Sequence, residues 1–88
     1  MGDADRLAKL DGWHSEGYAA RVHYEGGTER YSIEFYESKA CILYWIVHHD
    51  DDVAVPVSRE MVPDPLRERI RQDLMEAGID PEIETQTL

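Results

Sequence analysis

The feature that most constrains the fold of this chain is a pair of glycines, Gly26 and Gly27, between two alternating stretches. Before the glycines every second residue is apolar from Tyr18 onward, and after them the same alternation runs to Phe35. A period of two is typical of a strand that is buried on one face. Two adjacent glycines suit a tight hairpin turn, because glycine adopts positive φ without steric strain. The stretch therefore predicts an antiparallel hairpin.

A turn centred on the two glycines also predicts the register of this hairpin. The apolar pairs then lie on one face, and a slip of one residue would turn one strand's apolar set away from the core. These predicted pairs are Val22 with Tyr31, Ala20 with Ile33, and Tyr18 with Phe35.

A second hairpin follows, with Ser38 and Lys39 at its turn and a third strand from Ala40 to His48. Its predicted core-face pairs are Phe35 with Ile42, Ile33 with Tyr44, and Tyr31 with Ile46. The third strand is also apolar on its other face, and a strand of that kind is typically covered on both faces. The residues of this second apolar face are Cys41, Leu43, Trp45 and Val47.

A fourth strand is predicted from Val53 to Val57, after an acidic turn at Asp50 and Asp51. Pro56 has no N–H group to donate to a sheet, so this strand should lie at an edge. Its predicted pairs are His48 with Val53, Ile46 with Val55, and Tyr44 with Val57.

The stretch from Asp64 to Gly78 carries the signals of a helix. Asp64 is the expected N-cap, Pro65 the first helical residue, and Gly78 the left-handed residue that ends the helix. Ile79 should fold back onto the last turn, as in a Schellman ending. Apolar residues at helical spacing form the buried stripe, namely Leu66, Ile70, Leu74 and Ala77. A shorter helix, capped by Asp3 or Asp5, is expected from Asp3 to Leu10.

These elements predict an α+β fold: a four-stranded antiparallel β-meander with a C-terminal α-helix packed on one face and a short N-terminal helix. A chain of 88 residues is expected to form a single domain. Its expected parts are a short helix within 1–12, the sheet over 17–58, the helix over 64–78 and a flexible tail over 82–88.

The charge of the chain is strongly acidic. Asp and Glu number 19 against 9 Lys and Arg, a formal net charge of −10, and only Lys9 and Lys39 are lysines. In a chain patterned well enough to fold, this composition resembles that of small uncharacterised proteins from salt-loving archaea. The resemblance implies that the acidity is an adaptation to a salt-rich cytoplasm, where salt screens the self-repulsion.

Other features also favour a cytoplasmic location. A single cysteine, Cys41, cannot form an internal disulfide and fits a reducing compartment as a core or interface residue. The sequence has no apolar run long enough to span a bilayer, and its charged first residues do not resemble a signal peptide. We therefore expect no membrane association, and no motif indicates a cofactor.

Two imidazoles and three carboxylates follow the third strand, over 48–52. Imidazole and carboxylate groups bind divalent metals, so His48, His49, Asp50 and Asp52 form a candidate metal site. The alternative is a plain acidic turn, which we favour because adjacent histidines on a strand point to opposite faces.

Arg67, Arg69 and Arg71 lie in the first half of the predicted C-terminal helix, interleaved with acidic residues. The simplest interpretation is a solvated face with local ion pairs. The alternative is an anion contact, with a nucleic acid or with the acidic turn of a partner subunit.

The order helix, three strands, helix resembles that of a double-stranded RNA-binding domain. That family carries a lysine cluster at the start of its second helix, whereas here alternating charges run from Pro65 to Arg69 without a lysine. The resemblance implies an RNA-binding module, but phosphate binding needs a positive face, and the net charge argues against it.

Catalysis is a further alternative, because His23, Glu34 and Tyr36 share the second face of the sheet and His23 could act as a base. No nucleophile elbow, phosphate loop or redox cysteine pair supports an enzyme. We predict instead a non-catalytic protein-interaction or self-association domain, with a homodimer or protein partner contacting Leu43, Trp45 and Val47.

Overall fold

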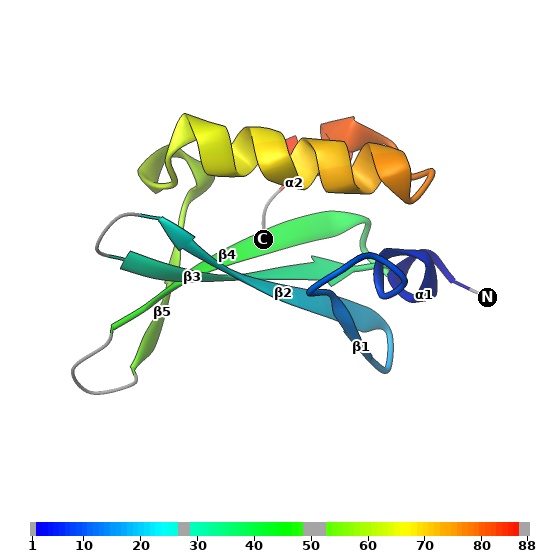
Figure 1. Ribbon diagram of the computed structural model, residues 1–88, viewed down its shortest axis with the longest axis horizontal. Coiled ribbons are helices and arrows are strands. Elements are labelled where there is room, and N and C mark those ends of the chain that lie inside the picture. The colour runs from blue at the N-terminus through cyan, green and yellow to red at the C-terminus, as the bar shows by residue number, and fades with distance from the viewer. Residues whose placement is uncertain (1, 27–28, 49–52, 87–88) are drawn as a thin grey trace.

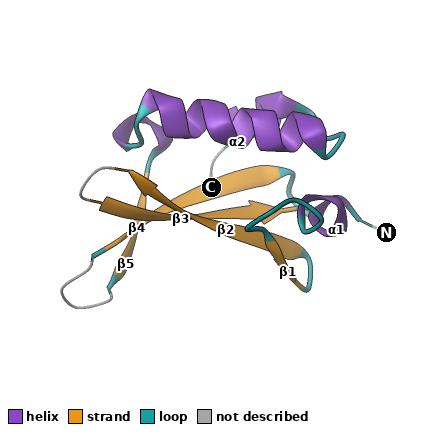
Figure 2. Cartoon of the chain, viewed as in Figure 1, coloured by secondary structure: helices purple, strands orange, loops and turns teal. Residues whose placement is uncertain are grey.

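The computed structural model describes residues 2–26, 29–48 and 53–86. It contains an antiparallel five-stranded sheet in the order β1-β2-β3-β4-β5, so each strand pairs with its neighbours in sequence. Helix α2 lies across one face of this sheet, and no described helix lies across the opposite face (Figures 1 and 2). The elements are α1 (Asp3–Leu7), β1 (His14–Glu16), β2 (Ala19–Gly26), β3 (Glu29–Tyr36), β4 (Cys41–Val47), β5 (Ala54–Val57), α2 (Asp64–Glu76) and two 3-10 helices, η1 (Arg59–Met61) and η2 (Pro81–Thr85).

The α+β fold and the antiparallel meander are as predicted, but the expected number of four strands is wrong. The additional strand is β1, which pairs with β2 across a tight turn at Gly17 and Tyr18. Gly17 has φ +63°, a conformation that glycine adopts without strain. All three residues of β1 are exposed, so the strand has no apolar alternation to mark it. Tyr18 belongs to this turn and is exposed, where a core strand residue was expected.

The predicted register of β2 and β3 is wrong by two residues. Val22 pairs with Ile33 instead of Tyr31, and β2 continues through Gly26 into the position expected for the turn. Because the shift is even, every side chain keeps its predicted face. The observed register also places Tyr24 opposite Tyr31, an apolar pair that the predicted register would have lost.

The registers predicted for the other two hairpins are confirmed. Strand β4 pairs with β3 through Ile33 and Tyr44, and with β5 through Ile46 and Val55. Strand β5 is an edge strand, as Pro56 predicted. The acidic turn between β4 and β5 lies outside the described residues.

The core lies between α2 and the sheet. Ile70 and Leu74 from the predicted helical stripe are fully buried, and Leu66 and Ala77 pack against the same cluster. Full burial of one such aliphatic side chain stabilises a fold by about 1.5–3 kcal/mol. The sheet contributes Ala20, Val22, Tyr31, Ile33, Phe35, Ile42 and Tyr44 to this cluster.

The end of α2 follows the predicted Schellman pattern. The N–H of Ile79 donates to the carbonyl of Leu74 at 2.8 Å, and that of Gly78 donates to Met75 at 3.0 Å, with Gly78 at φ +77°. The start differs from the prediction, because Pro63 is the N-cap residue and Asp64 is already helical. The Asp64 carboxylate pairs with Arg67 and does not cap the helix.

The two ends of the chain differ from expectation. Helix α1 stops at Leu7, with Gly2 as its N-cap, although Leu10 still packs against the core. The segment expected to be a flexible tail forms η2, in which Glu84 is completely buried. Beyond η2, the carbonyl of Gln86 accepts a hydrogen bond from the N–H of Ile42 at 2.8 Å. Residues 81–86 therefore belong to the packed structure.

Candidate functional site

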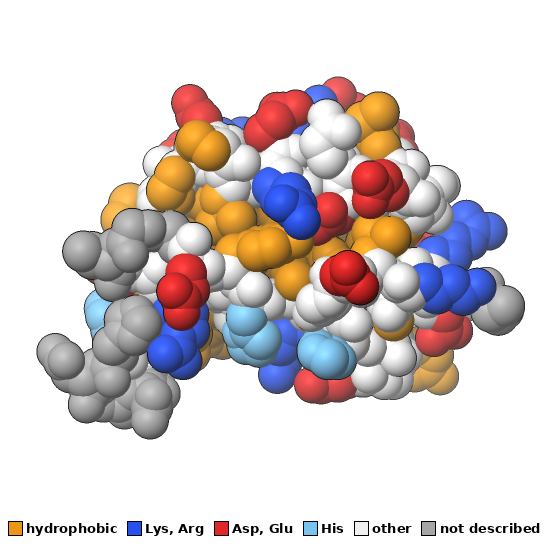
Figure 3. Space-filling view, in the orientation of Figure 1, with side chains coloured by type: hydrophobic (Ala, Val, Ile, Leu, Met, Phe, Trp, Pro, Cys, Tyr) orange, Lys and Arg blue, Asp and Glu red, His pale blue; other side chains and the backbone are white. Residues whose placement is uncertain are grey.

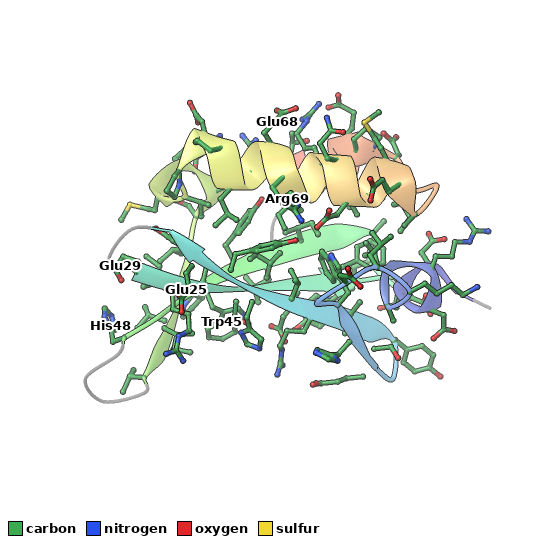
Figure 4. The ribbon with its side chains drawn as sticks, viewed as in Figure 1. Glu25, Glu29, Trp45, His48, Glu68 and Arg69 are labelled. Atoms are coloured by element: carbon green, nitrogen blue, oxygen red, sulfur yellow. The ribbon has the colours of Figure 1, made fainter. Side chains whose placement is uncertain are left out.

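The sheet face turned away from α2, here called the open face, is the main candidate for a functional surface. Alternation along the strands brings Arg21, His23, Ser32, Glu34, Tyr36, Leu43, Trp45, Val47 and Ala54 to this face. In Figure 4 the labelled Trp45 lies on the side of the sheet opposite α2. Most of these residues line a shallow groove of about 420 Å³.

Glu34 lies at the centre of the open face and is only 7% exposed. One carboxylate oxygen accepts from the indole Nε1 of Trp45 at 2.6 Å and from the hydroxyl of Tyr36 at 3.0 Å. The other oxygen accepts from Nη2 of Arg21 at 2.5 Å and from its Nε at 3.2 Å. Three neighbouring side chains therefore satisfy this carboxylate, and their own positions are held by it in turn.

This network controls the charge states at the centre of the open face. Burial raises the pKa of Glu34, but the hydrogen bonds from Arg21, Tyr36 and Trp45 outweigh it, so the net pKa is lowered. The hydrogen bond to Glu34 raises the pKa of Arg21. Burial, followed by the positive charge of Arg21, lowers the pKa of His23 from 6.5. At neutral pH the face thus presents an ionised Glu34–Arg21 pair and a neutral His23.

The three predicted interaction residues, Leu43, Trp45 and Val47, all lie on the open face and are partly exposed. Trp45 has a second role that the sequence did not indicate, because its N–H group is bound to Glu34. Cys41, at the start of the same strand, is buried, and burial raises the pKa of its thiol. A raised pKa disfavours the thiolate and therefore a nucleophilic role.

The open face is almost neutral in a strongly acidic chain. Its described strand residues include three carboxylates, Glu16, Glu25 and Glu34, and two guanidinium groups, Arg21 and Arg30, which gives a net charge of −1 against −10 for the chain. By contrast, charged side chains of both signs are scattered around the helix layer, with apolar side chains visible between α2 and the sheet (Figure 3).

The structure separates the three arginines that the sequence grouped as a possible anion contact. Arg69 turns toward the sheet, where its guanidinium lies 5.3 Å from the ring centroid of Tyr24 and donates to Asp73 at 3.3 Å (Figure 4). Arg67 and Arg71 instead line a second pocket of about 360 Å³, together with Arg59 from η1.

Two further buried carboxylates lie on the covered side of the sheet, and no local sequence pattern marks either of them. Asp73 accepts from the indole Nε1 of Trp13 at 3.0 Å and from the hydroxyl of Tyr24 at 2.7 Å. Glu84 accepts from the hydroxyl of Tyr44 at 2.8 Å and from two nitrogens of Arg59, at 3.0 Å and 2.7 Å. Burial, followed by these carboxylates, raises the pKa of both tyrosine hydroxyls, that of Tyr24 to about 12.

The candidate metal site cannot be assembled from the described part of the chain. His48 is exposed, whereas His49, Asp50 and Asp52 lie outside the described residues. Within 2–26, 29–48 and 53–86, no three His, Cys, Asp or Glu side chains are grouped closely enough to hold a metal ion.

The candidate catalytic residues His23, Glu34 and Tyr36 do share one face, as predicted. Tyr36 donates to Glu34, but no hydrogen bond joins His23 to either of them among the described residues. The geometry therefore shows a hydrogen-bonded network around Glu34 beside an exposed imidazole that is not part of it.

Comparison with known proteins places the chain in one family. A family model described as a family of unknown function, DUF7538, matches residues 4–86. The chain belongs to this family. Searches of curated proteins and of solved structures gave no match for this family member. None of its described helices is both long enough and apolar enough to cross a membrane.

Proposed function

We propose that this DUF7538 domain is a non-catalytic interaction module that self-associates through its open face. The observation that carries the proposal is the apolar strip of β4, formed by Leu43, Trp45 and Val47, on a sheet face that no described helix covers. An apolar strip flanked by polar residues is typical of a protein interface.

The polar centre of the open face supports this role. Burying an unpaired carboxylate in an interface is costly, but Glu34 already has its hydrogen bonds from Arg21, Tyr36 and Trp45. A partner can therefore cover Glu34 without supplying a donor. The network also holds Trp45 in place before contact, which reduces the entropy lost on association.

The charge of the open face favours a second copy of this chain as the occupant. Two chains of charge −10 repel each other through most of their surfaces. The open face carries only −1, so two copies that meet through it add little further repulsion at their contact. A two-fold axis through the β4 strip would place the same residues against each other, as in an isologous dimer.

The composition supports a salt-rich cytoplasm as the setting of this domain. At about 1 M salt, charges more than about 3 Å apart are largely screened, so the remaining repulsion between two acidic copies becomes weak. Association should therefore strengthen as potassium chloride is raised. Metal binding and nucleic-acid binding receive no support from the described residues and form no part of the proposal.

Light scattering on Val47→Glu at high potassium chloride tests the proposal. Val47 lies on the open face and pairs with Arg30, whereas Glu34 pairs with Leu43, so the substitution adds a charge to the proposed interface without removing a donor of Glu34. Met75→Glu is the matched control, because Met75 is an exposed apolar residue on α2, away from the open face. We expect the wild type and Met75→Glu to have twice the chain mass, and Val47→Glu to have the mass of one chain.

A wild type that stays monomeric at every salt concentration would contradict self-association. If both substitutions weaken association equally, the added charge by itself, and not its location on the open face, controls the mass. In either case the open face would have to serve a different partner or none.

A further inference from the structure

A second site is built where η1, the first half of α2 and η2 meet. Arg59, Arg67 and Arg71 converge there on one pocket of about 360 Å³. Their side chains are only 24%, 21% and 29% exposed, although arginine side chains are normally solvated. Three partly buried guanidinium groups in one pocket are unusual for a chain with a net charge of −10.

One of these three charges is already used by the fold. The buried Glu84 at the base of the pocket is held by two nitrogens of Arg59, at 3.0 Å and 2.7 Å, and by the hydroxyl of Tyr44. Arg71 approaches the same carboxylate only to 3.9 Å, beyond hydrogen-bond distance. Glu84 thus has its hydrogen bonds from Arg59 and Tyr44 and only a long ion pair with Arg71, so Arg67 and Arg71 remain as the groups that face the pocket.

Arg67 and Arg71 have carboxylate partners that exchange readily with solvent. Arg67 pairs with Asp64, whose side chain is 85% exposed, and Arg71 reaches Glu82, which is 67% exposed, only at 3.4 Å. Exposed pairs of this kind contribute little stability. Glu68, also at the pocket, lies on the side of α2 that is turned away from the sheet (Figure 4). A bound anion can therefore replace these carboxylates at low cost.

Both guanidinium groups line the pocket, and each keeps N–H donors for which no hydrogen-bond acceptor lies among the described residues. Every fully buried side-chain nitrogen and oxygen of the described residues has a partner, so donors without one have access to solvent. Arg67 uses its Nε to hold the carbonyl of Val62 at 3.1 Å, which fixes the side chain at the edge of η1. Two positioned planar forks, four residues apart on one helix, match the oxygens of a tetrahedral oxyanion.

We propose that Arg67 and Arg71, supported by the Arg59–Glu84 pair, bind a phosphate group or a phosphate ester. Three carboxylates line the pocket beside its three arginines, and Glu82 adds a fourth carboxylate next to Arg71, so long-range attraction is not the source of affinity. It comes from replacing two exposed ion pairs with bidentate hydrogen bonds to one doubly charged ligand. The site is independent of the open face and of self-association.

The test is a titration of the full chain with inorganic phosphate at constant ionic strength in potassium chloride, followed by heteronuclear NMR. We expect saturable shifts of the Arg67 and Arg71 side-chain Nε–H signals in the millimolar range. Arg67→Gln should weaken binding roughly tenfold, the size expected for losing a charged hydrogen bond. Arg69→Gln is the matched control: it removes the same charge from the same helix, but its side chain lies over Tyr24.

Several outcomes would overturn the proposal. They are the absence of saturable shifts in the wild type, equal weakening by Arg67→Gln and Arg69→Gln, and tighter binding of succinate than of phosphate at the same ionic strength. The wild-type titration decides the matter even if a variant fails to fold. Tighter binding of glucose 6-phosphate than of inorganic phosphate would support the site and identify its ligands as phosphate esters.

Discussion

Each side of the sheet contains a buried carboxylate with similar hydrogen-bond donors, but the two carboxylates have different roles. Glu84 on the covered side and Glu34 on the open side each accept hydrogen bonds from an arginine and a tyrosine hydroxyl. The partners of Glu84 are 25 and 40 residues away in sequence, whereas those of Glu34 are at most 13 residues away and lie within the sheet.

The difference in sequence separation shows what each carboxylate does. Asp73 resembles Glu84, because its donors Trp13 and Tyr24 are 60 and 49 residues away and it joins α2 to the start of the chain. These two carboxylates hold separate segments together. Glu34 joins strands that the sheet ladder already joins, so its network contributes less to assembly and more to the order of a surface.

Replacing each carboxylate by alanine tests this contrast most strongly. Glu84→Ala leaves Arg59 and the buried hydroxyl of Tyr44 without their partner and frees η2, so we expect a loss of about 3 kcal/mol or more. Glu34→Ala should cost about 1–2 kcal/mol, because Arg21 can turn toward solvent. Urea unfolding at high salt, followed by circular dichroism, measures both free energies. Equal losses of unfolding free energy would contradict the conclusion that Glu84 holds separate segments together whereas Glu34 mainly orders a surface.

A smaller change compares the two tryptophan donors. Trp13→Phe removes a buried hydrogen bond to Asp73 and leaves unfilled volume in the core, so it should cost about 2 kcal/mol. Trp45→Phe removes the bond to Glu34 and part of a ring that is already partly exposed, so it should cost only about 1 kcal/mol. The same urea experiment measures both. A larger loss for Trp45→Phe would show that the open face, too, helps to hold the fold together.

The smallest expected effect is a dependence of stability on pH. The native pKa of Glu34 is depressed below its ordinary value of 4.5, so between the two values the unfolded chain binds more protons than the native one. The stabilising contribution of Glu34 is therefore complete above the ordinary value and is lost as pH falls through the native pKa. The difference in unfolding free energy between wild type and Glu34→Gln should shrink over that acidic window. A difference that is constant with pH would show that Glu34 has an ordinary pKa in the folded protein.

Much of the sheet could be predicted because its signals are local. Alternation predicted the face of the core residues in β2, β3 and β4, although it wrongly placed Tyr18 in the core, and the second and third hairpins have the predicted pairs. The first hairpin is shifted by two residues because alternation cannot distinguish registers that differ by an even number. The pairing of Tyr24 with Tyr31 and of Glu25 with Arg30 favours the observed register.

The two elements that were not predicted, β1 and η2, have no hydrophobic periodicity. Strand β1 is short and exposed, and η2 has the composition of a tail. Both depend on neighbours, β1 on the ladder with β2 and η2 on the burial of Glu84 beneath Arg59. The candidate sites show the same limit. The apolar strip of β4 was evident, but the separation of Arg69 from Arg67 and Arg71 depends on which side of α2 faces Tyr24.

The sequence by itself determined the α+β class, the alternation of faces, the edge position of β5 and the glycine ending of α2, because each depends on residues close together in the chain. Only the tertiary structure decided which carboxylates are buried and which donors they bind. Glu34, Asp73 and Glu84 are chemically like the other acidic residues of the chain, and they differ only in the arginine, tyrosine and tryptophan donors that folding brings to them. A buried charge is tolerable only with such partners, so the same fold that buries these carboxylates must also supply their donors.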